Sequence, residues 1–170
     1  RSEEEISTWK VSDKKHISLA EVVKNAQPTV LIGCSTATGA FTDEILQEMY
    51  SYDKKPVIMP ISNPTSKAEA TPDRILRCTE GNALIATGSP FGTVEYNGRQ
   101  IKISQCNNAL VFPGIGIGMV ESQTRVLTDE MLLKASEVLA KESAASSDPN
   151  ALLPSFAEVR SISKKISSIF

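Results

Sequence analysis

TVLIG at residues 29–33 is a short apolar run rich in β-branched residues, which is typical of a strand buried on both faces of a sheet. Two similar runs follow, PVIMPIS at 56–62 and ALIAT at 83–87. Helical patterns precede the three runs, at residues 19–25, 42–52 and 66–79. Helix–strand units that repeat with short connections predict a parallel sheet with crossover helices, which is an α/β fold.

The pattern changes after the third apolar run. Residues 94–101 alternate in polarity around Asn97-Gly98, a dipeptide that strongly favours a tight hairpin turn. A polar cluster at 104–108 comes next and has no periodicity of its own. This part of the chain is therefore expected to be a hairpin followed by a polar loop.

Apolar residues at helical spacing dominate the remainder of the chain. The first of these segments carries Gly114, Gly116 and Gly118, whose missing side chains would let another backbone approach closely. Helices are expected at 113–125, 129–141 and 154–170, and a Ser/Ala-rich linker at 142–150 divides the last two. An α/β unit followed by C-terminal helices is thus the expected organisation.

Composition excludes several classes of protein. The chain has 170 residues, of which 41% are apolar, so it can bury a core. Its net charge of −2 gives no positive field for general nucleic-acid binding, and no apolar run approaches the ~20 residues of a membrane span. Three widely spaced cysteines and one histidine cannot build a structural zinc site or a disulfide framework, which indicates a reducing, cytoplasmic compartment.

Ligands of an open parallel sheet bind at the carboxyl ends of its strands. Small, hydroxyl and amide residues follow all three expected strands here: Gly33, Ser35 and Thr36; Ser62 and Asn63; Thr87, Gly88 and Ser89. Such groups suit the floor of a polar, nucleotide-like site, since they offer close approach and neutral hydrogen bonds. The alternative is that they are ordinary turn residues, because Gly, Ser and Asn dominate turns.

Three asparagines are candidates for ligand binding. Asn63 precedes Pro64, which favours an extended conformation and so restricts where its amide points. Asn107 and Asn108 precede the glycine-rich apolar segment, where one of the two is expected to cap a helix and the other to be free for a ligand. The residues alone show no acid–base pair, nucleophile or metal-ligand set, so the chain by itself is expected to bind and not to catalyse.

Several motifs give the chain a family resemblance. Residues 61–69 (ISNPTSKAE), 86–91 (ATGSPF) and 105–114 (QCNNALVFPG) resemble the SNPT-x-x-AE, A-[ST]-G-SPF and GQ-x-NN…[FY]PG motifs of the malic enzymes. Residues 31–33 and 39–42 fit the same family, with a similarity to the malolactic enzymes. Because the motifs occur in the family's order, the resemblance is specific.

The resemblance implies a function and a division of the chain. Residues 1–105 would be part of a Rossmann-like NAD(P)-binding domain, and 106–170 a helical segment that packs on a catalytic domain. The whole enzyme would oxidise and decarboxylate malate to pyruvate with NAD or NADP and a divalent cation, Mg or Mn. The alternatives are a malolactic enzyme, which yields lactate, a non-catalytic nucleotide-binding module, and an oligomerisation segment with 107–170 as its exposed apolar surface.

The resemblance also implies roles for individual residues. Asn63 and one of Asn107 and Asn108 would bind the carboxylate or hydroxyl of malate, and Gly33, Ser35 and Asn63 would lie along the cofactor. The family's catalytic tyrosine and lysine, its acidic metal ligands and its G-x-G-x-x-G loop have no match in this chain. Catalytic and metal-binding residues are therefore expected in a missing N-terminal catalytic part.

This chain departs from the family at two positions. Ser104 replaces the glycine of GQ-x-NN, and Cys106 is bulkier than the usual residue. The two changes are expected either to narrow the substrate pocket or to mark a divergent specificity. Malate, pyruvate, the N-terminal part and further copies of the enzyme are the expected partners, with neither nucleic acid nor membrane among them. The expected location is the cytoplasm, or the mitochondrial or plastid matrix in a eukaryote.

Overall fold

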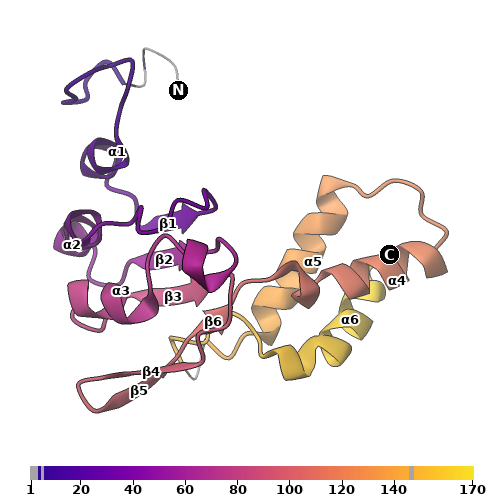
Figure 1. The fold of residues 1–170 in the computed structure, drawn as a ribbon. Helices are drawn as coiled ribbons and strands as arrows, with labels where there is room; N and C mark the ends of the chain where they lie inside the picture. The colour runs from indigo at the N-terminus through magenta and orange to yellow at the C-terminus, as the bar shows by residue number, and fades with distance from the viewer. Residues whose placement is uncertain (1–3, 5, 146–147) are drawn as a thin grey trace.

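A parallel four-stranded sheet forms the centre of the computed structural model, which describes residue 4, residues 6–145 and residues 148–170. Its strand order is β1-β2-β3-β6, and all three neighbouring pairs are parallel (Figure 1). The strands are β1 (Val30–Gly33), β2 (Val57–Pro60), β3 (Leu84–Thr87) and β6 (Ser104–Gln105). The α/β class and the three predicted strands are confirmed.

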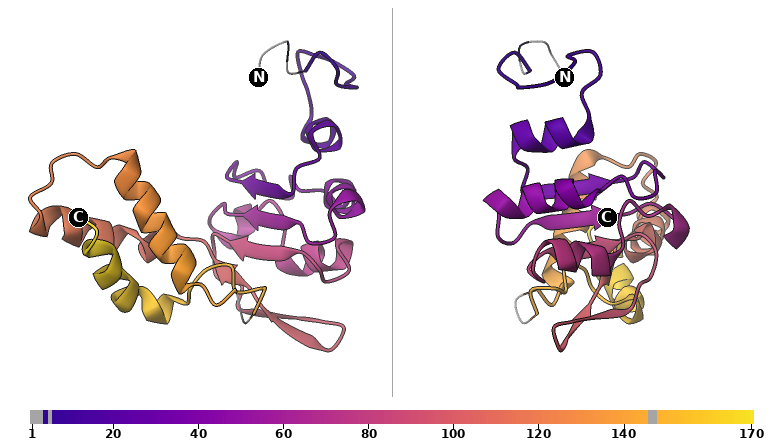
Figure 2. Two further views of the ribbon diagram at one scale, coloured as in Figure 1. Left: turned by 180° about the vertical axis from the view of Figure 1, so that it is seen from behind. Right: turned by 60° about the vertical axis from the view of Figure 1, so that its left-hand side comes forward.

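Three helices pack on one face of this sheet (Figure 2): α1 (Leu19–Ala26), α2 (Asp43–Tyr52) and α3 (Pro72–Cys78). Ser18 and Glu21 form a capping box at the start of α1, and Thr42 caps α2. Pro72 occupies the first turn of α3, where its missing N–H is not needed. The core between the helices and the sheet includes the fully buried Leu46, Met49, Ile58, Ile75 and Leu76.

The opposite face of the sheet has little cover at β1. Along this strand Leu31 is buried, but Val30 and Ile32 are 46% and 56% exposed. The prediction that residues 29–33 are buried on both faces is therefore wrong. The reason is that α1, α2 and α3 all lie on the same side, so only alternate side chains of β1 meet a helix.

A hairpin follows β3, built from β4 (Thr93–Tyr96) and β5 (Arg99–Lys102). Asn97 and Gly98 turn it with φ angles of 49° and 74°, as a type I′ turn requires. The expected polar loop after the hairpin instead begins with β6, which pairs with β3 through Ala86 and Ser104.

The last third of the chain forms a separate group of helices beside the sheet (Figure 1). It contains α4 (Phe112–Glu121), α5 (Asp129–Glu142) and α6 (Val159–Ser167), with the 3-10 turns η2 (Asn108–Leu110) and η3 (Phe156–Glu158). Its own core contains Ala135, Ile162 and Ile166. All three predicted helices are present: α4 and α6 are shorter than predicted, and α5 extends one residue beyond the predicted 129–141. Ser146 and Ser147 of the predicted linker lie outside the described residues.

Two glycines explain how closely α4 packs on α6. A Cβ atom on Gly114 would lie 2.7 Å from Cβ of Ile166, and one on Gly118 would lie 2.5 Å from a ring carbon of Phe170. The expected close approach is confirmed at these positions. It is wrong for Gly116, where a Cβ atom would meet nothing within 4 Å because that position faces away from α6. No helix in the described ranges has the length and apolar character needed to cross a membrane.

Candidate functional site

The carboxyl ends of β1 and β2 are joined by a network of hydrogen bonds. The Thr36 N–H donates to Oγ of Ser62 over 2.9 Å, and the Ser62 hydroxyl donates to Oε1 of Glu69 over 2.5 Å. The N–H and hydroxyl of Ser35 donate to the same carboxylate oxygen, at 2.9 and 3.1 Å. The polar residues that were expected to meet at these two strand ends therefore do so.

The ends of β2 and β3 are joined in a similar way. Oδ1 of Asn63 accepts a 2.6 Å hydrogen bond from the hydroxyl of Ser89. Gly88 lies directly against β2, because a Cβ atom there would collide with the carbonyl oxygen of Ile61 and lie 3.0 Å from Nδ2 of Asn63. The side chain of Asn63 is thus exposed but held in one orientation.

The fourth strand brings the remaining asparagines to the same edge of the sheet. The Cys106 N–H donates to the carbonyl of Thr87 over 2.8 Å, which continues the parallel pairing beyond Gln105. Oδ1 of Asn107 accepts from the N–H of Ala109 over 2.9 Å and so caps η2, while Asn108 is exposed. This division matches the expectation that one asparagine caps a helix and the other is left free.

At Gly33, on the same edge, the neighbouring side chains leave no room for a Cβ atom. A Cβ atom on Gly33 would lie 2.6 Å from the ring of Phe41 and 2.7 Å from Cδ of Glu69. Ser35 is exposed just beyond it, and its hydroxyl also accepts from the N–H of Ala37. Glu69 is the residue that sequence reasoning missed, and its place as the last residue of the 61–69 motif (ISNPTSKAE) was the available signal.

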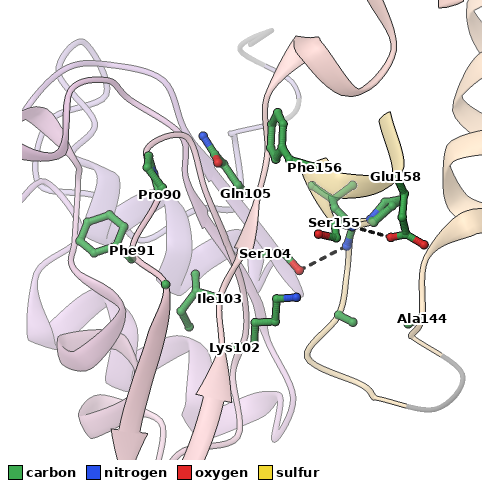
Figure 3. Close-up of a pocket in the computed structure, with 14 residues that line it drawn as sticks. Pro90, Phe91, Lys102, Ile103, Ser104, Gln105, Ala144, Ser155, Phe156 and Glu158 are labelled. Carbon is green, nitrogen blue, oxygen red and sulfur yellow. Dashed lines mark hydrogen bonds between the residues drawn. The ribbon is translucent and has the colours of Figure 1, made fainter. Parts of the chain in front are cut away.

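Ser104 forms hydrogen bonds with the linker before the last helix. Its hydroxyl donates to the carbonyl of Asn150 over 3.2 Å. It also accepts from the N–H of Leu153 over 3.3 Å, the bond drawn as a dashed line from Ser104 in Figure 3. The serine that replaces the family's glycine is thus bonded to a segment almost fifty residues further along the chain. For the neighbouring Cys106, burial raises the pKa of the thiol, so it stays protonated at neutral pH and is a poor nucleophile.

A pocket of about 290 Å³ lies where the sheet meets the helical group (Figure 3). Its walls include Phe91, Lys102, Ser104, Phe156 and Glu158. None of the predicted site residues lines this pocket. It is therefore a gap at the junction of the two groups, and it borders the strand-end edge at Gln105, the last residue of β6.

The groups at the strand ends can bind but cannot perform acid–base chemistry alone. They are amides, hydroxyls and backbone N–H groups, and Glu69 is enclosed beneath them. Across the part of the chain that the structure describes, no group of three or more His, Cys, Asp or Glu side chains could hold a metal ion. The site is suited to orienting a polar ligand, and a divalent cation does not fit the residues present.

A parallel four-stranded sheet flanked by helices, with polar groups at its carboxyl edge, is consistent with a Rossmann-like nucleotide-binding domain. Residues 1–169 match the family described as the malic enzyme NAD binding domain. The chain therefore belongs to that family, which confirms the resemblance seen in its motifs.

Individual relatives agree with the family match. An NAD-dependent malic enzyme from Sodalis glossinidius is 49% identical over 162 residues, which cover 95% of this chain and 28% of that protein. Proteins of the same name from Aliivibrio fischeri (48% over 164 residues, 96% and 29%) and Pectobacterium atrosepticum (50% over 151 residues, 88% and 27%) are similar. The chain thus spans less than a third of the length of these curated relatives.

Proposed function

We propose that this chain is the carboxyl-terminal, dinucleotide-binding part of an enzyme that oxidises and decarboxylates malate to pyruvate. The observation that carries the proposal is the joined set of neutral polar groups at the exits of β1, β2 and β3. Family membership and the names of the relatives support the same conclusion.

The proposed substrate contacts follow from the orientation of the asparagines. Ser89 donates to Oδ1 of Asn63, and the amide nitrogen of Asn63 makes one long hydrogen bond, 3.5 Å, to the carbonyl of Ile61. The second N–H of this amide is left to donate to a carboxylate or hydroxyl of malate. Asn107 uses its oxygen to cap η2, so the exposed amide of Asn108 is the better candidate for the second contact. Neutral amides suit this task because they do not titrate near neutral pH.

The proposed cofactor is NAD, in keeping with the names of the relatives, and NADP is the alternative that an assay must exclude. Gly33, Ser35 and Asn63 would lie along the dinucleotide. When bound, the dinucleotide supplies the acceptor for the hydride of malate, while these residues position it. The Mg or Mn ion of the whole enzyme would take its ligands from outside this chain.

Exposed apolar side chains mark the proposed contact with the remaining catalytic part. On α4, Phe112 and Val120 are 68% and 79% exposed, and Leu133 of α5 is also exposed. Apolar side chains gathered on one group of helices indicate a surface that another part of the protein covers. We propose that residues 106–170 pack on the catalytic part through this surface and that residues 1–105 complete the nucleotide domain. We also propose that the whole enzyme is a homo-oligomer. The three cysteines of this chain are free, which supports a proposed cytoplasmic location.

The test is malate-dependent NAD reduction in the presence of Mn, with pyruvate and lactate measured as products. A full-length polypeptide that carries this segment is expected to form NADH and pyruvate, and the 170-residue chain alone is expected to be silent. Asn63→Ala should raise KM for malate about tenfold through the lost hydrogen bond, whereas the exposed Gln47→Ala should not. Lactate without NADH would favour a malolactic enzyme, and no turnover would overturn the proposal.

A further inference from the structure

Glu69 is a fully buried carboxylate beneath the carboxyl edge of the sheet. Its side chain has 0% exposure, and it lies between η1 (Thr65–Lys67) and α3. Oε1 accepts three hydrogen bonds, from the N–H and hydroxyl of Ser35 and from the hydroxyl of Ser62. Oε2 is buried without a hydrogen-bond partner. The three hydrogen bonds that other residues donate to this carboxylate therefore all come from the exits of β1 and β2.

The hydroxyl of Ser62 extends this network to the next residue of the β1 exit. It donates to Glu69 and at the same time accepts from the N–H of Thr36. The backbone of the same segment adds further ties, because the carbonyl of Glu69 accepts from the Phe41 N–H over 3.0 Å and that of Ala68 accepts from the Gly39 N–H over 3.2 Å. The loop after β1 is thus fixed along its length to the segment that carries Glu69.

The charge on Glu69 is maintained in spite of its burial. Burial raises the pKa of the carboxyl, but the hydrogen bonds from Ser62, from the backbone of Glu69 itself and from Ser35 together outweigh it and leave the pKa below its ordinary value. A buried carboxylate with one unpartnered oxygen is costly, and an apolar side chain would fill the space at lower cost. Packing alone does not account for a glutamate at this position.

We propose that Glu69 is a positioning residue of the dinucleotide site, which holds the exits of β1 and β2 at the separation that the cofactor requires. It acts through Ser62 and Ser35 and does not touch the ligand, because its carboxylate is enclosed by them. This inference rests on the proposed function and adds to it the residue that fixes the shape of the cofactor cleft.

The experiment compares variants in a full-length malic enzyme polypeptide that carries residues 1–170. Glu69→Gln keeps the size of the side chain and removes its charge. It is expected to raise KM for NAD about tenfold, with kcat changed less than about twofold, because the cleft loses its shape while the reacting groups stay. Glu44→Gln, an exposed position on α2, is the matched control and should behave as the wild type.

Ser62→Ala provides a second measurement that does not depend on the first variant folding. It should raise KM for NAD in the same direction, and the double variant should be no worse than Glu69→Gln alone, since both changes break one network. Wild-type turnover with unchanged KM for NAD in both variants would overturn this inference alone. Failure of the wild type to bind and reduce NAD would overturn the proposed function and this inference with it.

Discussion

The hydroxyl of Ser89 donates a 2.6 Å hydrogen bond to Oδ1 of Asn63 and so ties the exit of β3 to that of β2. The bond lies at the edge where the substrate is proposed to bind, and it decides which end of the Asn63 amide faces outward. A contact between two neutral side chains thus sets the polarity of the site.

Ser89→Ala tests this relationship. The variant leaves Oδ1 of Asn63 unpaired and frees its amide to rotate, so KM for malate should rise in the full-length enzyme. The free energy of unfolding of the chain should fall by about 1 kcal/mol, as is usual for one hydrogen bond. Ser51→Ala removes an exposed hydroxyl on α2 and is the control. Identical KM values in the two variants would contradict the assigned orientation.

Alanine substitutions at two glycines of α4 are expected to change the stability of the chain in opposite directions. Gly114→Ala should destabilise the chain by about 1–3 kcal/mol, because its methyl group would press on Ile166. Gly116→Ala should stabilise it by about 0.5–1 kcal/mol, since the methyl meets nothing and alanine favours a helix. Urea unfolding of the two variants measures both effects, and equal signs would show that α4 does not pack on α6 as described.

Ser104→Ala removes both hydrogen bonds between β6 and the linker before α6. The amide of Leu153 loses its acceptor and should exchange its hydrogen with solvent faster, whereas the Ile103 amide, bonded to Gly92, should keep its protection. Ser136→Ala, on the exposed side of α5, is the control. Unchanged exchange at Leu153 would mean that Ser104 does not hold the linker.

Glu21 makes the stability of the amino-terminal segment depend on pH. Hydrogen bonds from the Ser12 and Ser18 backbone lower the pKa of this carboxyl from 4.5 to about 2. A carboxyl whose pKa is lowered on folding stabilises the folded state fully at pH values above its unfolded-state pKa. This stabilisation is lost as the pH falls through the folded-state pKa. Wild type should therefore exceed Glu21→Gln in unfolding free energy above pH 4.5, and the difference should vanish near pH 2. A difference that persists below that pH would contradict the assignment.

Elements that depend on local chemistry could be predicted from the sequence. The Ser18–Glu21 capping box and the Asn97-Gly98 turn each carry their cause within a few residues. β6 could not be predicted, because two polar residues have no periodicity and this strand exists only through its pairing with β3. The exposure of β1 was missed for a related reason, since an apolar run does not reveal whether anything covers it.

Some residues of the candidate site could likewise be located from the sequence, and others could not. The strand ends could be located because the order of helices and strands places Ser35, Asn63 and Ser89 at one edge. The role of Glu69 could not be predicted, because two of the hydrogen bonds to it come from Ser35, 34 residues away. The contact of Ser104 with the linker could not be predicted either, because Leu153 lies 49 residues further along the chain. Only the folded chain shows that these two side chains connect separate segments.

The bare face of β1 has a consequence for handling this chain on its own. β1 is an edge strand of four residues with Val30 and Ile32 exposed, whereas β6 at the other edge has only two residues. The unpaired backbone groups of an apolar edge strand recruit strands from other molecules, and the two residues of β6 offer fewer such groups than the four of β1. Concentrated samples should therefore aggregate through β1, and a lysine in place of Ile32 should keep them dispersed.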